Sequence, residues 1–324
     1  MGATTTTALK ARPSGRAQSF QQRLRSGDEL AYAITFVAAV SILAITALLV
    51  YELYLNSALS RHKFGWSFLW SQTWNPSGDQ FGALPFVYGT VVTSALAMLI
   101  AIPLGVGAAI FLAELAPPRI SAGLTFLIEL LAAVPSVIFG MLGIFILVPV
   151  LVKLEDPIRK TLGWTPLFQG PFIGVSMLGA GVVLALMIIP FIISISREVI
   201  LAVPNEQREA ALALGATRWE TTWDVVVPFA YKGITGSIFL ALARALGETM
   251  AVTMVIGNDP RIHASLFAPA YTIAAVIANQ FAESSSDLHT SALIEVGLVL
   301  FVLTIVINGA ARVLVASTTT KAGT

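Results

Sequence analysis

Residues 88–115 read YGTVVTSALAMLIAIPLGVGAAIFLAEL, a run in which Glu114 is the single charged side chain. A helix rises about 1.5 Å per residue, so about 20 apolar residues cross a hydrocarbon core of about 30 Å. Of the 324 residues, 56% are hydrophobic and 11% are charged, whereas about 25% are charged in an ordinary soluble domain. The composition therefore predicts an all-α polytopic membrane protein.

Six apolar runs of this kind predict six transmembrane helices. They are expected at residues 30–54, 88–115, 121–152, 172–195, 232–256 and 292–315. The third run is too long for one straight crossing and contains Pro135 and Pro149, so we expect a kinked or broken helix. A further apolar stretch at 266–281 is short for a crossing. We expect it to be interfacial or re-entrant, with a seventh span as the alternative.

The segments outside these runs set the expected topology. Residues 1–29 are rich in Thr, Ser, Arg and Gln, which predicts a disordered tail and not a cleaved signal peptide. Residues 55–87 form the expected extracytoplasmic loop, with Trp66, Trp70 and Trp74 suited to the membrane interface. With both termini cytoplasmic, twelve Lys and Arg residues fall on the inner side and six in outer loops. This excess agrees with the positive-inside rule, and it makes residues 316–324 a cytoplasmic tail.

Several classes of function have no support in the composition. The formal net charge is +1 and the basic residues are dispersed, so nucleic-acid binding is not expected. The chain has no cysteine, and His62, His263 and His289 are expected in loops without ligand spacing, so we expect no metal site. No glycine-rich phosphate loop with Lys and Ser or Thr is present, so nucleotide is not held by that route. We expect no catalytic residue and no cofactor.

The polar stretch 197–231 is the largest charged interruption between spans. It contains Glu209-Ala210-Ala211, then Gly215, then Val225, Val227 and Pro228. We expect Asn205 to cap a short helix, Gly215 to end or bend it, and Pro228 to restart the chain at a membrane edge. The small alanines would allow close approach to a partner, so the helix could transmit motion between subunits. The alternative is an amphipathic helix on the lipid surface.

The fifth apolar run contains two opposite charges. If residues 232–256 form one helix, Arg244 lies near the bilayer midplane and Glu248 lies one turn later on the same face. An intramembrane arginine costs about 2.5–3.5 kcal/mol on insertion scales, so the pair needs a reason to exist. One reading is a structural helix–helix ion pair. We favour the other, a translocation path in which the guanidinium fork binds a tetrahedral oxyanion.

Three further residues, Glu129, Ser136 and Thr249, are candidates for the same path. Glu129 is a third intramembrane acid, and the Pro135-Ser136 break beside it could free backbone N–H groups for an anion. Helix packing is the alternative for Glu129. Thr249, next to Glu248, completes the candidate set.

Three sequence blocks resemble known transporters. The Glu209-Ala210-Ala211 stretch with Gly215 and Pro228 resembles the EAA loop of ABC importer permeases, which forms the coupling helix that docks on the ATPase subunit. The runs RALGETMAV (244–252) and IELLAAVPSVIFG (128–140) are similar to blocks of the phosphate-specific permeases of PstC and PstA type. The Trp74-Asn75-Pro76 loop and the extra first helix favour the PstC type.

The resemblance implies a function and a set of partners. Residues 88–315 would be the core permease domain, in the type I ABC importer architecture, with 197–231 as its coupling loop. Arg244 and Glu248 correspond to the charged pair implicated in this family. The expected partners are a second, PstA-type permease, two ATP-binding subunits, an extracytoplasmic phosphate-binding protein, phosphate and membrane lipids. The expected location is the bacterial inner membrane. The alternatives are a permease for sulfate, molybdate or phosphonate, or a secondary transporter.

A carboxylate in an anion path has two possible reasons. Inorganic phosphate keeps a P–OH group at neutral pH, and Glu248 could accept its hydrogen bond, whereas fully ionised sulfate would be repelled. Glu248 could equally neutralise Arg244 when the path is empty.

Overall fold

The computed structural model describes residues 28–321 and divides into two compact units, Met1–Glu52 and Leu53–Thr324. The predicted tails 1–29 and 316–324 fall partly outside the described residues, although α15 includes residues up to Lys321. Helix α2 (Asp28–Asn56) begins in the first unit.

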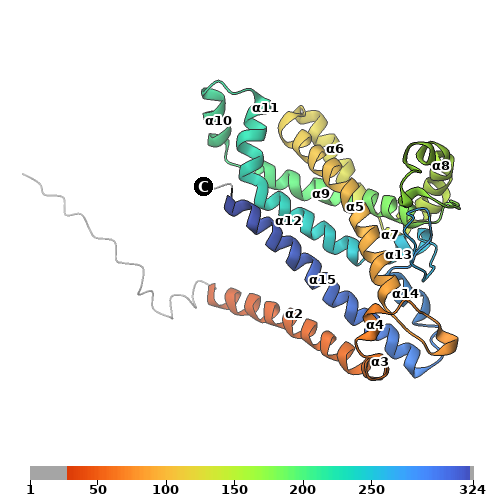
Figure 1. Cartoon of the computed structure of the whole chain (residues 1–324). Coiled ribbons are helices and arrows are strands. Elements are labelled where there is room, and N and C mark those ends of the chain that lie inside the picture. Colours follow the sequence, from red (N-terminus) through yellow and green to blue (C-terminus); the bar gives the residue numbers. More distant parts are fainter. Residues whose placement is uncertain (1–27, 322–324) are drawn as a thin grey trace, which may run out of the picture. The chain divides into compact units, whose positions relative to one another are not determined.

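The remaining helices, shown in Figure 1, are α3 (Ala58–Phe64), α4 (Ser67–Trp70), α5 (Leu84–Ile110), α6 (Pro118–Ala132), α7 (Ser136–Leu142), α8 (Val148–Leu162), α9 (Met177–Leu201), α10 (Asn205–Ala213), α11 (Arg218–Thr221), α12 (Val227–Leu246), α13 (Met250–Val255), α14 (Ile273–Gln280) and α15 (Asp287–Lys321).

Six helical stretches in the described part of the chain are long and apolar enough to cross a membrane. They are Glu29–Asn56, Leu84–Leu115, Ser136–Leu162, Met177–Leu201, Arg218–Leu246 and Asp287–Val313. The predictions of an all-α fold and of six spans are confirmed. The polar stretch 197–231 is largely helical. Helix α9 continues to Leu201, and a new helical stretch begins at Arg218.

Helices α5 and α9 pack along each other at the centre of the second unit. Their shared core is built from small side chains, including Ala97, Ala101 and Ala180, which are fully buried. A Cβ atom on Gly181 of α9 would lie 2.5 Å from Leu96 Cδ2 of α5. Small residues thus bring the two backbones close together, as in other membrane helix pairs. Helices α12 and α13 pack against α9.

The third predicted span is broken, as expected. Helix α6 ends at Ala132 and α7 begins at Ser136, with Pro135 between them. Proline has no N–H group and cannot continue the hydrogen-bond ladder of α6. The break leaves α7 free to pack against α13, and the two helices lie side by side in Figure 1.

Residues 266–281 do not form a seventh span. Their helical part, α14, has eight residues and would cover about 12 Å. Its first residues are buried, and the Ile273 N–H group donates a hydrogen bond to Thr90 Oγ1 of α5 at 3.0 Å. The segment is therefore packed into the second unit beside α5 and α15.

The loop 55–87 is more ordered than its polar sequence indicates. Trp66 and Trp70 are exposed, but Trp74 packs edge-on against Phe81 and Phe86 at 4.9 and 4.8 Å between ring centroids. His289 stacks on Phe81 in a buried position of α15. The expectation that His289 lies in a loop is wrong because the last helix begins five residues earlier than predicted, and His62 is helical in α3.

Two glycines of α5 give a matched test of this packing. A Cβ on Gly89 would lie 2.2 Å from the carbonyl oxygen of Tyr271, which is backbone and cannot rotate away, whereas a Cβ on Gly107 would meet no atom within 4 Å. We expect Gly89→Ala to destabilise the purified protein by about 1–3 kcal/mol through overpacking. Gly107→Ala should be neutral or stabilising by up to about 1 kcal/mol.

Thermal unfolding of the two variants in detergent checks this prediction. Equal midpoints for both variants would contradict the close approach of α5 to residue 271.

Candidate functional site

The fifth span is interrupted where the two candidate charges lie. Helix α12 ends at Leu246, Gly247 leaves helical geometry at φ −94° and ψ 0°, and α13 begins at Met250. The prediction that Arg244 and Glu248 share one face of a continuous helix is therefore wrong. Gly247 has no side chain to stabilise a helical turn, which makes the break cheap at this position. Arg244 lies in the last turn before the break, and Glu248 and Thr249 lie in it.

Local backbone contacts hold Glu248. Its Oε1 atom accepts a hydrogen bond from the Ala251 N–H group at 3.1 Å. Glu248 precedes the N-cap residue Thr249, which makes no side-chain cap bond, and the bond from Ala251 occupies part of the Glu248 carboxylate. Thr249 Oγ1 donates to the Gly247 carbonyl oxygen at 3.3 Å and is half-buried, like Glu248. The carboxylate is thus fixed at the break by α13, and not by Arg244.

Arg244 has a different environment. Its guanidinium carbon lies 5.9 Å from the centroid of the Phe191 ring, a weak cation–π contact. The side chain is exposed. Within residues 28–321 the guanidinium group has no hydrogen-bond acceptor and no carboxylate partner. All five N–H donors of this group therefore remain available to an anion.

Helix α7, which begins at Ser136, packs on α13. A Cβ on Gly140 of α7 would lie 2.6 Å from Met254 Sδ and 3.2 Å from Ala251 Cα of α13. A Cβ on Gly143, in the π-helical turn after α7, would lie 2.8 Å from Val255 Cγ2. Ser136 therefore begins a helix that contacts the helix after the break.

Glu129 is not brought into this arrangement by any recorded contact. It lies on α6, before the Pro135 break, and its side chain is exposed. Among the described residues its carboxylate has no hydrogen-bond or ion-pair partner. The same part of the chain contains no group of three or more His, Asp or Glu side chains that could hold a metal ion.

The loop after α13 contains a charge pair that neutralises itself. Arg261 Nε donates to Asp259 Oδ1 at 2.9 Å, and Arg261 Nη2 donates to Oδ2 at 2.5 Å. These hydrogen bonds lower the pKa of Asp259. This loop therefore provides a self-paired arginine, in contrast to Arg244.

The predicted coupling motif forms helix α10 and the turn after it. Glu209 and Ala210 are exposed and Ala211 is half-buried. Gly215 has φ +92°, a conformation that favours glycine, and it ends the helix. Asn205 does not cap α10 as expected. It is the first helical residue, and its side-chain oxygen accepts from Arg208 Nη1 at 3.3 Å.

Pro228 also differs from its predicted role. Residues 218–246 form one helical stretch through α11, a π-helical turn at Thr222–Val226 and α12, so Pro228 lies inside it and does not restart the chain. The preceding π-turn accommodates the missing N–H group of proline. Thr217 is the N-cap of α11 and forms a capping box with Glu220. The Thr217 side chain accepts a hydrogen bond from the Glu220 backbone N–H, and the Glu220 side chain accepts one from the Thr217 backbone N–H.

An ion pair not expected from the sequence ties α10 to the end of the second span. Arg208 Nη2 lies 2.7 Å from Glu114 Oε1, with side chains 16% and 12% exposed. Arg208 also donates to the carbonyl oxygens of Val203 and Ile200. Both charges are visible in the sequence, but they are 94 residues apart, so no spacing rule pairs them.

Exposed apolar side chains surround this anchored helix. Leu214 is 90% exposed, and Trp219 and Trp223 pack edge-to-face at 5.6 Å while remaining exposed. Leu212 on α10 is exposed as well. Large exposed aromatic and aliphatic side chains next to small alanines are typical of a protein-docking surface.

Comparison with known proteins gives a consistent set of relatives. Residues 101–320 match the family described as "Binding-protein-dependent transport system inner membrane component". A phosphate transport system permease protein PstC of Mesorhizobium japonicum is 46% identical over 296 residues, covering 90% of each chain. PstC of Xylella fastidiosa is 47% identical, covering 80% of this chain and 81% of its own. PstC 2 of Mycobacterium tuberculosis is 39% identical, covering 89% and 91%.

Solved structures share the fold at low sequence identity. A bacterial ABC transporter involved in the import of the acidic polysaccharide alginate matches with TM-score 0.54 and 17% identity, covering 90% of this chain and 98% of its own. The inward-facing MetNI methionine ABC transporter matches with TM-score 0.53 and 16% identity, covering 72% and 95%. The chain therefore belongs to the family of binding-protein-dependent transport system inner membrane components and has the fold of an ABC importer permease.

Proposed function

We propose that this chain is the membrane permease subunit of an ATP-driven importer of inorganic phosphate, and that the break between α12 and α13 lines the substrate path. The observation that carries the proposal is Arg244, whose guanidinium group stands beside a helix break with all its donors free. Non-helical backbone inside a membrane is tolerated where it lines a cavity or is buried in protein. The names of the PstC relatives support phosphate as the substrate.

Each residue at the break has a proposed role toward phosphate. Arg244 donates two parallel hydrogen bonds to the anion. Glu248, fixed by the Ala251 N–H group, accepts the P–OH proton with its remaining lone pairs. Thr249 and Ser136 supply hydroxyl groups. Glu129 is proposed to face the path from α6, before the Pro135 break. A single guanidinium binds weakly enough for the substrate to leave.

Transport requires motion that this chain receives from partners. In the proposed cycle two ATP-binding subunits close on ATP, and the surface formed by Glu209, Ala210 and Ala211 moves with them. The Glu114–Arg208 pair passes that motion from α10 to the π-helical turn Phe111–Leu115, which continues α5. The spans around Arg244 then open outward, so the site is exposed alternately to the two sides.

The remaining parts of the assembly follow from the family. We infer a second, PstA-type permease and an extracytoplasmic phosphate-binding protein, with the chain in the bacterial inner membrane and both termini cytoplasmic. ATP hydrolysis belongs to the ATP-binding subunits, and this chain is not an enzyme. The family description as a binding-protein-dependent inner membrane component supports this arrangement.

The first prediction concerns substrate recognition at Arg244. In a permease-null strain supplied with the partner subunits, Arg244→Gln should lower labelled phosphate uptake at least about tenfold, since hydrogen bonds to charged groups contribute about 1.5–3 kcal/mol. Arg244→Lys keeps the charge but loses the fork and should give an intermediate rate. Membrane abundance is matched by immunoblot.

Sulfate competition in the same assay separates the alternatives. Wild-type uptake should ignore sulfate, whereas Glu248→Gln, which can still accept from the Ala251 N–H group through its amide oxygen, should become sensitive to it. Uptake that survives Arg244→Gln would contradict the site. Wild-type uptake inhibited by sulfate would indicate another oxyanion, and uptake without ATP hydrolysis would indicate a secondary transporter.

The second prediction concerns coupling. Breaking a largely buried ion pair costs about 3–5 kcal/mol, so Glu114→Gln or Arg208→Gln should loosen α10 from α5. In the purified complex, phosphate transported per ATP hydrolysed should fall while ATPase activity remains. Arg119→Gln removes an exposed arginine of α6, outside the coupling loop, and serves as the matched control.

The charge-swapped double variant, Glu114→Arg with Arg208→Glu, tests whether the pair itself matters. Partial recovery of transport per ATP is expected. A transport-to-ATP ratio equal to wild type in both single variants would show that the pair does not transmit motion.

A further inference from the structure

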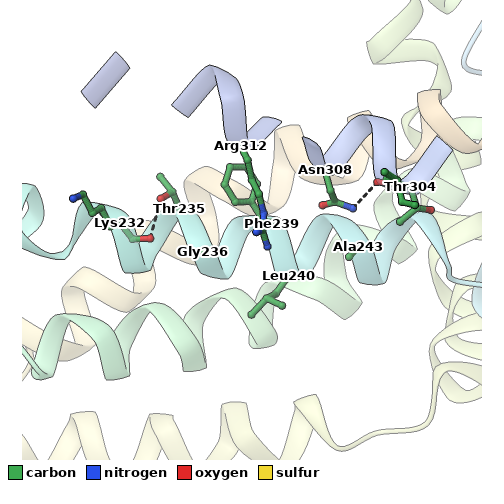
Figure 2. Close-up of a pocket in the computed structure, with 10 residues that line it drawn as sticks. Lys232, Thr235, Gly236, Phe239, Leu240, Ala243, Thr304, Asn308 and Arg312 are labelled. Atoms are coloured by element: carbon green, nitrogen blue, oxygen red, sulfur yellow. Dashed lines mark hydrogen bonds between the residues drawn. The ribbon is translucent and has the colours of Figure 1, made fainter. Parts of the chain in front are cut away.

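A cavity of about 490 Å³ lies between α12 and α15, and its lining on α12 runs from Lys232 to Ala243, one residue before Arg244. Figure 2 shows its lining, with α12 on one side and α15 on the other. Pockets of about 300–1,000 Å³ are typical of small-molecule sites. Lining residues are Lys232, Thr235, Gly236, Phe239, Leu240, Ala243, Thr304, Ile305, Asn308 and Arg312.

The charges that line this cavity are both positive. Lys232 and Arg312 contribute them, and no carboxylate is present in the lining. Neither cationic group has a hydrogen-bond or ion-pair partner among the side chains that the structure describes. Two unpaired cations in one cavity repel each other and attract anions.

The neutral polar side chains in the lining have already used part of their hydrogen-bonding capacity. Thr235 Oγ1 donates to the carbonyl oxygens of Tyr231 and Lys232, and Asn308 Nδ2 donates to the carbonyl oxygen of Thr304. Dashed lines in Figure 2 mark the Thr235–Lys232 and Asn308–Thr304 bonds. One Asn308 N–H donor remains free, together with the donors of Lys232 and Arg312. The free donors therefore outnumber the free acceptors, which suits an oxyanion.

The rest of the cavity is apolar and has room beyond an ion. Phe239, Leu240, Ala243 and Ile305 line it, and a Cβ on Gly236 would meet no atom within 4 Å. Lys232 lies in the second turn of α12, close in sequence to the coupling segment, and Arg312 lies in the last third of α15. The charged part is therefore at the coupling-loop end of the two helices, as in Figure 1.

We propose that this cavity is a second anion site, in which Lys232 and Arg312 bind a phosphate group. Two sources have this chemistry. One is the headgroup of an anionic phospholipid whose acyl chain lies along Phe239 and Ile305. The other is free inorganic phosphate that leaves the substrate path. This second source rests on the proposed function.

Lipid retention by the complete, detergent-purified importer complex tests the first source. Native mass spectrometry compares phosphatidylglycerol with phosphatidylcholine, which has no net charge. Wild type should retain phosphatidylglycerol preferentially, and Lys232→Gln/Arg312→Gln should weaken retention at least about tenfold, since both charged contacts are lost. Arg119→Gln/Lys160→Gln removes one exposed arginine and one exposed lysine elsewhere and should leave retention unchanged.

Equilibrium binding of labelled inorganic phosphate to the delipidated complex, purified without the phosphate-binding protein, tests the second source. The Arg244→Gln variant is the background, so that the break does not contribute. Binding that is lost in the Lys232→Gln/Arg312→Gln variant, without a preference for phosphatidylglycerol, identifies free phosphate. Gly236→Leu should block either ligand by filling the cavity, whereas Gly236→Ala should not.

The proposal is overturned if wild type binds neither probe, or if neither probe distinguishes wild type from the Lys232→Gln/Arg312→Gln variant. Phosphatidylglycerol retention does not depend on transport, so this arm remains informative if the chain imports a different substrate. If wild type retains phosphatidylglycerol but takes up no phosphate, the proposed function is rejected and the cavity proposal stands.

Discussion

The central physical constraint on this protein is that polar backbone and charged groups inside a membrane must be paired, hydrated or turned toward a cavity. Two helices of the second unit break this continuity, at Pro135 and at Gly247, and their second halves pack against each other as α7 and α13. Glycines at 140 and 143 allow that approach because any side chain there would clash. The unpaired Arg244 and the anchored Glu248 lie at one of these breaks, so the substrate recognition that we propose depends on packing between the two short helices.

In the proposed cycle, the same architecture connects substrate recognition to the ATP-binding subunits. Helix α10 lies outside the spans, yet Arg208 bonds both Glu114 and the backbone at the end of α9. A partner that moves α10 thereby pulls on α5 and α9, which form the central packed pair. Helix α12, which ends at Arg244, packs against α9 as well. A short chain of packed elements therefore joins the coupling helix to the break.

Much of this fold could be predicted from hydrophobicity alone, because six long apolar runs allow few alternatives in a bilayer. The break at Pro135 was predictable because proline removes a backbone donor. The break at Gly247 was not, because a glycine inside a helix costs only about 1 kcal/mol and usually does not end it. The Glu114–Arg208 pair and the burial of His289 depend on contacts between distant segments, which no local pattern encodes. Arg244 and Glu248 could be singled out because charges in apolar runs are costly, but their separate environments required the structure.

The most direct measurement of the central claim uses the absence of cysteine from the chain. A Thr249→Cys variant in the assembled transporter would be labelled with a membrane-impermeant, charged thiol reagent, with phosphate or sulfate present during ATP turnover. If the break lines the phosphate path, the reagent reaches the new thiol, phosphate slows the labelling and sulfate does not. A thiol that the reagent never reaches, or labelling that both anions leave unchanged, would contradict the account and make the break a feature of helix packing.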